Sequence, residues 1–400
     1  MPDPSADPAT DLPSLTAAVR RALDDPGADL VDWTQAPLDY ENFGTGSRAL
    51  RRLSGTARRS GTGEIAPWSM VLKALTLPAD DDRATDEADD YAYWRRETLI
   101  YGSGLLDDLP AGFRAARCYG VTTSPDADQV WLEDLRDAFP NGWPLERFEL
   151  AARHLGRFNG AWLGDRRLPD RAWLAGMESV QEFWSANVST MPGLEALLDP
   201  AAWARTTADG GLPRTPEPRS LRAILADRRP VIDALAAQRP TLCHNDAGIT
   251  NLFAVRTDDG RDTTVAIDWQ LAGLAPPGTE LAMLVGGSVL FCRAPAGSID
   301  ALSEATLRGY VDGLADSGAS LDRDDVAFAF AAASVLRLSA IVGAWIHALA
   351  DQDERDRTAS FWGHPAEELA GQWAPLVTFL ETQAAIVVQR LGLPVARSGH

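Results

Sequence analysis

The sequence predicts an α+β fold with two parts, a small antiparallel sheet and a mainly helical region that follows it. Strand patterns bounded by turn residues dominate residues 28–135. Beyond Leu135 apolar residues recur at helical spacing, as in the run from Leu145 to Trp162. We therefore expect a β-rich lobe in residues 28–135 and a helical lobe in residues 136–400.

The segment before the sheet, residues 1–27, is expected to hold a flexible leader and one short helix. Its first residues are acidic and proline-rich without an apolar core, which does not fit a signal peptide. We expect disorder up to about Leu12. Ser14 can cap a helix that buries one apolar face, formed by Leu15, Val19 and Leu23.

The composition is that of an ordinary globular protein, with 45% hydrophobic and 24% charged residues. The formal net charge of −20 argues against a nucleic-acid or membrane-surface partner, because both are polyanions that need a basic patch. An acidic surface suits a cationic ligand, but it serves solubility equally well. The three cysteines, Cys118, Cys243 and Cys292, form neither a disulfide framework nor a zinc pattern, so a reducing cytoplasm is expected.

One long apolar stretch, residues 326–350, is nearly long enough to span a bilayer. Arg337 stands at its middle, and a charge at the centre of a membrane is costly. Alanines also dilute its hydropathy. We therefore interpret this stretch as a buried helix of a globular lobe.

Four polar residues gather around a predicted hairpin. His244, Asp246 and Asn251 lie in a loop that runs into an apolar strand from Leu252. A turn-rich polar segment then leads into a second apolar strand, which ends at Asp268. The hairpin therefore brings three polar groups, Asp246, Asn251 and Asp268, to one end.

These side chains are the ones that phosphoryl transfer from a nucleotide triphosphate requires. One carboxylate accepts the proton of the attacking hydroxyl, while an Asn and a second Asp hold Mg²⁺. Asp246 is the candidate base, and Asn251 and Asp268 are the candidate metal ligands. Asp and Asn are also common in plain turns, but a carboxylate at the end of an apolar strand is costly to bury unless something binds it. His244 is a second candidate catalytic residue, although its place suits an organising role in the loop better.

The pattern His244-x-Asp246-x4-Asn251, followed by Ile267-Asp268-Trp269, resembles the catalytic signature of the aminoglycoside phosphotransferase and choline kinase family. The resemblance implies a protein-kinase-like two-lobe fold. It also implies phosphorylation of small-molecule hydroxyls with ATP or GTP and Mg²⁺. Further parts of this plan follow upstream in family order.

A glycine-bearing turn with Gly44, Gly46 and Ser47 precedes a strand predicted from Arg48 to Arg59. In the kinase plan, backbone amides of such a turn cover the phosphates, because glycine lets the chain approach closely. Glycine turns between strands are common, so a plain turn stays an alternative.

Lys73 lies in an apolar strand, and Glu97 shares a helix face with Trp94 and Tyr101 on a helix that Thr85 can cap. Both charges would be buried, and an unpartnered buried charge is strongly disfavoured. In the kinase plan such a lysine grips the nucleotide phosphates and is held by such a glutamate. We therefore predict a Lys73–Glu97 ion pair, against the alternative of two unrelated surface charges.

Two more strands, residues 116–122 and 129–132, lead into Glu133 and Leu135. This junction resembles the hinge of the family, where backbone groups bond the adenine.

Two positions depart from the family pattern. Glu280 stands where the family usually has an aspartate that braces the catalytic loop, and a longer carboxylate can still reach. Asn245 and Ala247 replace a more usual glycine and bulky residue beside the base.

In the family, helices around the catalytic loop form the acceptor pocket. We expect helices at residues 172–189 and 220–238. Trp143, Trp173 and Trp184 are candidates for a sugar site, although tryptophans in helices are more often core residues.

The sequence thus predicts a Mg²⁺-dependent kinase that transfers the γ-phosphate of ATP or GTP to a hydroxyl of a small molecule. Family analogy and the acidic surface favour an amino sugar, an aminoglycoside-like compound or another natural product as acceptor. Two alternatives stay open, a kinase of Ser or Thr in a precursor peptide and a catalytically inactive nucleotide-binding module. No nucleic-acid or membrane partner is expected.

Overall fold

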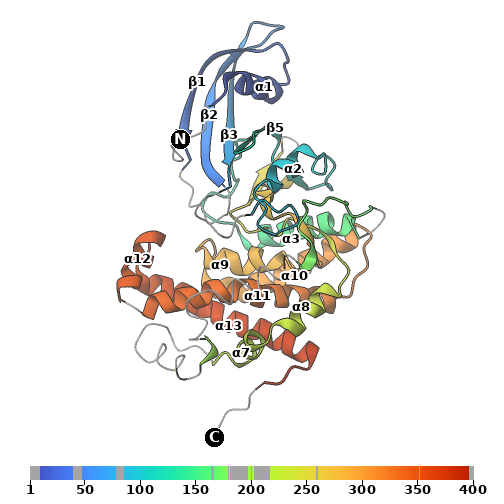
Figure 1. The fold of residues 1–400 in the computed structure, drawn as a ribbon, viewed down its shortest axis with the longest axis vertical. Helices are drawn as coiled ribbons and strands as arrows, with labels where there is room; N and C mark the ends of the chain where they lie inside the picture. Colours follow the sequence, from blue (N-terminus) through green and yellow to red (C-terminus); the bar gives the residue numbers. More distant parts are fainter. Residues whose placement is uncertain are drawn as a thin grey trace.

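The computed structural model describes residues 10–38, 47–77, 85–163, 166–178, 180, 197–199, 201, 217–257, 260–350 and 352–395. Within these residues the chain forms a sheet-rich lobe and a larger helical lobe (Figure 1). The predicted α+β, two-lobe fold is confirmed.

The first lobe is built on a five-stranded antiparallel sheet in the order β1-β2-β3-β6-β5. Its strands are β1 (Asp29–Pro37), β2 (Ser47–Arg58), β3 (Ile65–Leu75), β5 (Cys118–Thr123) and β6 (Asp128–Glu133). The strand predicted from Arg48 is β2, and the two strands predicted before the hinge are β5 and β6. Because β3 is central and pairs with β6, Lys73 stands opposite Val130 in the middle of the sheet.

Helix α1 (Leu12–Ala22) packs against this sheet, where Leu15 and Val19 share a core cluster with Trp68 and Trp131. The predicted cap was wrong. Asp11 caps the helix, since its carboxylate accepts a hydrogen bond from the Ser14 amide at 3.0 Å.

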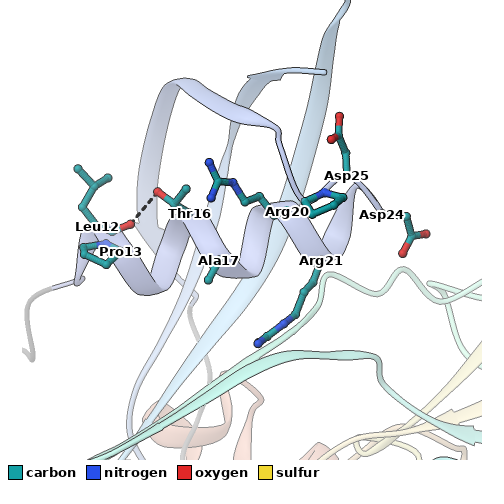
Figure 2. Close-up of a pocket in the computed structure, with 9 residues that line it drawn as sticks. Leu12, Pro13, Thr16, Ala17, Arg20, Arg21, Asp24 and Asp25 are labelled. Atoms are coloured by element: carbon teal, nitrogen blue, oxygen red, sulfur yellow. Dashed lines mark hydrogen bonds between the residues drawn. The ribbon is translucent and has the colours of Figure 1, made fainter. Parts of the chain in front are cut away.

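The outer side of α1 borders an open hollow of about 840 Å³ (Figure 2). In this view Arg21, one of the lining residues, extends from α1 towards the neighbouring strands and donates to the carbonyl of Tyr119 at 2.7 Å. Only α1 and the turn after it line the hollow, and no candidate site residue does.

Helix α2 (Arg96–Gly102) begins later than predicted. Thr85 does not cap it, because Thr85 pairs with Tyr93 in an isolated β-bridge. Glu97 nevertheless lies in the first turn of α2 and is fully buried, as its predicted face required.

A second, three-stranded sheet joins the lobes in the order β4-β9-β8. Strands β8 (Leu252–Arg256) and β9 (Asp262–Ala266) form the predicted antiparallel hairpin. Strand β4 (Phe113–Ala115), from within the first 135 residues, pairs with β9 in parallel. A short pair, β7 (Thr241–Cys243) with β10 (Gly273–Ala275), lies at the base of the catalytic loop.

The described helices of the second lobe are α3 (Leu145–Ala161), α7 (Arg219–Ala226), α8 (Arg229–Ala236), α9 (Ser288–Leu290), α10 (Ile299–Asp316), α11 (Arg323–Ala350), α12 (Gln352–Trp362) and α13 (Ala366–Leu391). Short 3-10 turns lie at Trp269–Leu271 and Ala296–Ser298, and a π-helical turn lies at Met283–Gly287.

Two helix predictions need correction. The helix expected over residues 220–238 is two helices, because Pro230, which lacks an N–H, starts α8 and cannot continue α7. Residues 172–176 form turns and a β-bridge in which Ala175 pairs with Gly273. Residues 179 and 181–189 lie outside the described residues.

Of the three tryptophans considered for a sugar site, Trp143 precedes α3 and is buried in the main core. Its indole N–H donates to Asp137. Trp173 is partly buried and packs against two core clusters. The core interpretation fits both, while Trp184 lies outside the described residues.

Helix α11 has the length and composition of a membrane span over Arg323–Ala344, but 88% of its apolar stretch is buried inside the protein. Its Arg337 is buried within the second lobe rather than facing a bilayer. The interpretation as a buried helix therefore fits the structure.

Helices α3 and α10 are in very close contact through glycines. A Cβ added to Gly156 would lie 2.1 Å from the carbonyl oxygen of Tyr310, and one added to Gly313 would lie 2.0 Å from that of Arg153. Both obstacles are backbone atoms, so the helices would have to move apart. This interface carries Asn159, which reaches the catalytic segment as described below.

Replacing Gly313 with Ala should lower the midpoint of thermal or urea unfolding, with a loss of about 1–3 kcal/mol as expected for an overpacked core. Gly371→Ala on α13 is the matched control, since nothing lies within 4 Å of its added Cβ. The control should be neutral or gain up to about 1 kcal/mol from helix propensity. Equal midpoints for the two variants would contradict this account of the interface.

Candidate active site

The β8–β9 hairpin brings the predicted polar residues together. Leu252 stands opposite Ala266 in the ladder, and the Ile267 amide donates to the Asn251 carbonyl at 3.0 Å. This register places Asn251 and Asp268 at the same end of the hairpin. Asp246 joins them because the loop folds back onto Asn251.

The hydrogen bonds of the Asn251 side chain fix its orientation and leave its Oδ1 without a hydrogen-bond partner. Its Nδ2 donates to the backbone carbonyl of Asp246 at 3.0 Å and to the Asp246 carboxylate at 2.8 Å. Only the amide nitrogen can make these two bonds, so the orientation of the side chain is determined. Its Oδ1 is buried and has no hydrogen-bond partner, which suits a ligand for a hard cation.

The predicted Lys73–Glu97 ion pair is present, at 2.5 Å. The same Lys73 ammonium also contacts the Asp268 carboxylate at 2.7 Å, across the two lobes. Burial disfavours the charged lysine, but the attraction of Asp268 and then Glu97 outweighs it and raises the pKa of Lys73. The ammonium is therefore held permanently charged beside both carboxylates.

Beside Glu97, Arg96 is fully buried and was not predicted as a site residue. Its guanidinium donates to the carbonyls of Trp173 at 2.6 Å, Tyr91 at 2.6 Å and Gln270 at 2.9 Å. Burial lowers its pKa to about 10, still charged at neutral pH. Arg96 thus ties α2, and with it Glu97, to the segment that follows Asp268.

Two residues of the site adopt left-handed backbone conformations, Asn245 at φ +63° and Asp268 at φ +60°. Glycine is the usual residue there, and Asn and Asp are the side chains that tolerate it best. Asn245 therefore occupies the position of the family glycine without requiring one. Such conformations concentrate at functional sites.

His244 has an organising role. Its Nδ1 accepts a hydrogen bond from the Asp246 amide at 3.1 Å, and its Nε2 donates to the Ile267 carbonyl at 2.7 Å. Burial lowers its pKa and keeps it neutral. Both ring nitrogens are engaged with backbone groups, which fits the organising role in the loop, and a catalytic role of His244 stays a prediction.

Glu280 reaches the catalytic loop. Its Oε1 accepts from the amides of His244 at 2.6 Å and Asn245 at 3.1 Å. Burial raises its pKa to about 7. The longer side chain thus supplies the bracing contact expected of the family aspartate.

Arg337 also contacts the loop. From the middle of α11 it donates to the Asn245 carbonyl and forms an ion pair with the Asp246 carboxylate. The sequence did not reveal this partner. The available signal was a single charge within a long apolar stretch, which was used only to exclude a membrane span.

The residues predicted to bind the nucleotide lie only partly within the described chain. Gly44 and Gly46 lie outside the described residues, and Ser47 begins β2. Glu133 ends β6 at the expected hinge, where its carboxylate pairs with Arg114 at 2.6 Å, and Leu135 follows it, half-buried. Adenine contacts by this segment stay a prediction.

No group of three or more His, Cys, Asp or Glu side chains suited to a metal occurs in the described part of the chain. A Mg²⁺ ion that is shared with nucleotide phosphates needs only one or two protein ligands. The unpartnered Oδ1 of Asn251 and the partly exposed carboxylate of Asp268 fit that requirement.

The two-lobe fold and the cluster of Asp246, Asn251, Asp268 and Lys73 have the composition expected of a kinase-like phosphotransferase site. The comparison with protein families agrees, since residues 174–318 match the model of the phosphotransferase enzyme family, APH. The match includes the catalytic loop, Asp268 and Glu280. It confirms the predicted resemblance and the predicted class of enzyme.

Solved structures that resemble the chain include amicoumacin kinase hAmiN in complex with AMP-PNP, Ca²⁺ and Ami, with 14% identity, 84% of this chain and 87% of that chain covered, and a TM-score of 0.48. Spectinomycin phosphotransferase, in complex with ADP and spectinomycin, has 12% identity, 94% and 100% coverage and a TM-score of 0.49. Choline kinase from Cryptosporidium parvum has 10% identity, 94% and 97% coverage and a TM-score of 0.45. No curated protein matches the sequence.

The raised pKa of Glu280 predicts a specific pH dependence of stability. Because the pKa of about 7 in the folded protein exceeds the ordinary glutamate value of 4.5, the folded protein holds a proton that the unfolded chain releases. This contribution is complete below about pH 4.5 and is lost as the pH rises through about 7.

Between pH 5 and pH 8 the wild type should therefore lose more stability than Glu280→Gln, by on the order of 2–3 kcal/mol. The glutamine stays neutral and keeps an acceptor oxygen for the loop amides. Urea unfolding at both pH values measures the difference, with Glu304→Gln at an exposed position of α10 as control. An identical pH response of wild type and Glu280→Gln would contradict the assignment.

Proposed function

We propose that this protein is a Mg²⁺-dependent kinase that transfers the γ-phosphate of ATP or GTP to a hydroxyl of a small molecule. The observation that carries the proposal is the meeting of Asp246, Asn251 and Asp268 at one end of the hairpin, with Lys73 bound to Asp268 at 2.7 Å. These groups come from both lobes. They are the set that in-line phosphoryl transfer uses.

Asp246 acts as the base of the reaction. It accepts the proton of the acceptor hydroxyl as that oxygen forms its bond to the γ-phosphorus, and the bond to the β-phosphate bridging oxygen breaks. The nucleoside diphosphate leaves and keeps the oxygen that bridged its β-phosphate to the γ-phosphorus. Most of the rate enhancement comes from positioning and charge neutralisation, with a modest share from the base.

Lys73 contributes the fixed positive charge for the nucleotide phosphates, held by Glu97 from α2. Asn251 and Asp268 would hold the metal, which supplies neutralisation of the phosphate charge when bound. Glu280 and His244 keep the loop that carries Asp246 in place through backbone amides and carbonyls.

The proposed acceptor class rests on the charge of the chain and on the names of similar solved structures. The similar solved structures are named as an amicoumacin kinase, a spectinomycin phosphotransferase and a choline kinase. The net charge of this chain is −20. We favour a cationic, hydroxylated small molecule such as an amino sugar, acting in the cytoplasm. A precursor-peptide Ser or Thr is the second acceptor class, and the retained base and metal ligands argue against an inactive module.

Asp246→Asn should leave Mg·nucleotide binding within about threefold of wild type and reduce kcat by about 10²–10⁴-fold, because it removes the base and keeps the shape. Asp268→Asn should abolish turnover and weaken binding of nucleotide in the presence of Mg²⁺. Calorimetric nucleotide titrations and a diphosphate-release assay separate the two effects.

Asp262→Asn is the matched control, a carboxylate on the same hairpin that pairs with Arg256 at the surface. It should behave as wild type in both assays. Unchanged turnover in Asp268→Asn would refute the assignment of the site.

A screen of hydroxylated acceptors for Mg²⁺-dependent ADP or GDP formation tests the substrate class. Amino sugars should stimulate diphosphate release above the hydrolysis background, and neutral sugars of the same size should do so less. Stimulation by Ser- or Thr-containing peptides alone would favour the second acceptor class. Nucleotide binding with no stimulated release by any acceptor would favour the inactive module.

A further inference from the structure

Arg337 is the buried charge that the reaction described above leaves unexplained. It is 8% exposed, and its neighbours Leu336 and Leu338 are fully buried in the main core. Taking a guanidinium out of water is expensive unless its partners compensate. An apolar residue would fill this place in α11 at lower cost, so stability of the helix alone does not account for it.

Two contacts of Arg337 lie at the candidate base. One terminal nitrogen donates to the carbonyl of Asn245, and the other pairs with Oδ1 of Asp246. The second carboxylate oxygen of Asp246 accepts from Asn251 at 2.8 Å. Both oxygens of the base are thereby held by donors from different elements, α11 and the catalytic loop.

The guanidinium suits this task because it is planar and its donors have a fixed geometry. The guanidinium binds the Asn245 carbonyl and the Asp246 carboxylate together, and thereby fixes the side-chain rotation of Asp246 relative to the backbone. A lysine, with a single ammonium on a flexible stem, could not hold both oxygens in the same geometry.

We propose that Arg337 is a positioning residue for phosphoryl transfer, which holds the Asp246 carboxylate in the one orientation that meets the acceptor hydroxyl. The proposal rests on the proposed function. It assigns to α11, beyond the matched residues 174–318, a direct part in building the site. Asp246 touches the acceptor, and Arg337 acts through Asp246.

Three variants test it. Arg337→Gln removes the charge, and Arg337→Lys keeps the charge but loses the planar guanidinium with its two terminal donors. Arg390→Gln is the matched control, because Arg390 also pairs with an aspartate, Asp325 at 2.5 Å, but at an exposed position away from the catalytic loop. For each, we would measure kcat, the KM for the acceptor, the Kd for Mg·nucleotide and hydrogen–deuterium exchange of the peptide spanning residues 244–251.

Arg337→Gln should lower kcat by about 100-fold, the scale of a misplaced reacting group, with Kd for nucleotide within about threefold of wild type. Arg337→Lys should fold as wild type and lose about tenfold in kcat. Exchange in residues 244–251 should accelerate in Arg337→Gln and not in Arg390→Gln. Millimolar methylguanidinium should partly restore kcat of Arg337→Gln, which a merely structural role would not produce.

A kcat within about threefold of wild type in Arg337→Lys, or unchanged exchange of the catalytic loop in Arg337→Gln, would overturn the proposal. If Arg337→Gln does not fold, Arg337→Lys alone decides through kcat at equal thermal midpoint. If the wild type transfers phosphate to no acceptor, the proposed function fails. The exchange experiment then still judges whether Arg337 positions the loop.

Discussion

The site depends on one buried cation shared between the lobes. Lys73 stands on the central strand of the sheet and binds Glu97 of α2 and Asp268 of the hairpin. Since Lys73 and Glu97 are nearly or fully buried, neither tolerates loss of its partner. Sheet, helix and hairpin must therefore adopt one relative placement, and that placement defines where nucleotide phosphates can lie.

In the second lobe, side chains hold the catalytic loop in place by binding its backbone and that of the strand before it. Glu280 accepts from two amides of the catalytic loop, and Arg96 donates to the carbonyls of Tyr91 and Gln270, which lie in different lobes. Asn159 on α3 donates to the Leu242 carbonyl at 2.8 Å and accepts from Tyr310 of α10 at 2.6 Å. The closely packed α3–α10 pair thereby supports the strand that leads into His244.

Local patterns were enough for much of this arrangement. The apolar strand around Lys73 and the apolar end of the hairpin at Asp268 each carried a charge that needed a partner, and that requirement predicted the ion pair and the cluster. The alternation and turn residues predicted the sheet and hairpin. Cap and boundary details failed where a neighbouring residue competed, as Asp11 did with Ser14 and Pro230 did within the predicted helix.

Contacts between distant segments were beyond the sequence. The hydrogen bonds of Arg96 go to main-chain carbonyls, which leave no trace in residue type. The Ala175–Gly273 bridge replaces a helix by pairing between segments far apart in the chain. Arg337 was visible as a misfit in an apolar helix, but its partner, 91 residues away, was not. Periodicity reports which face is buried and not what it is buried against.

That separation has a consequence for the newly made protein. Asp246 leaves the ribosome 91 residues before Arg337, which at about 5–20 residues per second is roughly 5–20 seconds. During that interval the catalytic loop lacks the guanidinium that holds its carboxylate. On the proposed role of Arg337, the nascent chain carries the candidate reacting groups before it carries a finished site, which is complete only once α11 has been made.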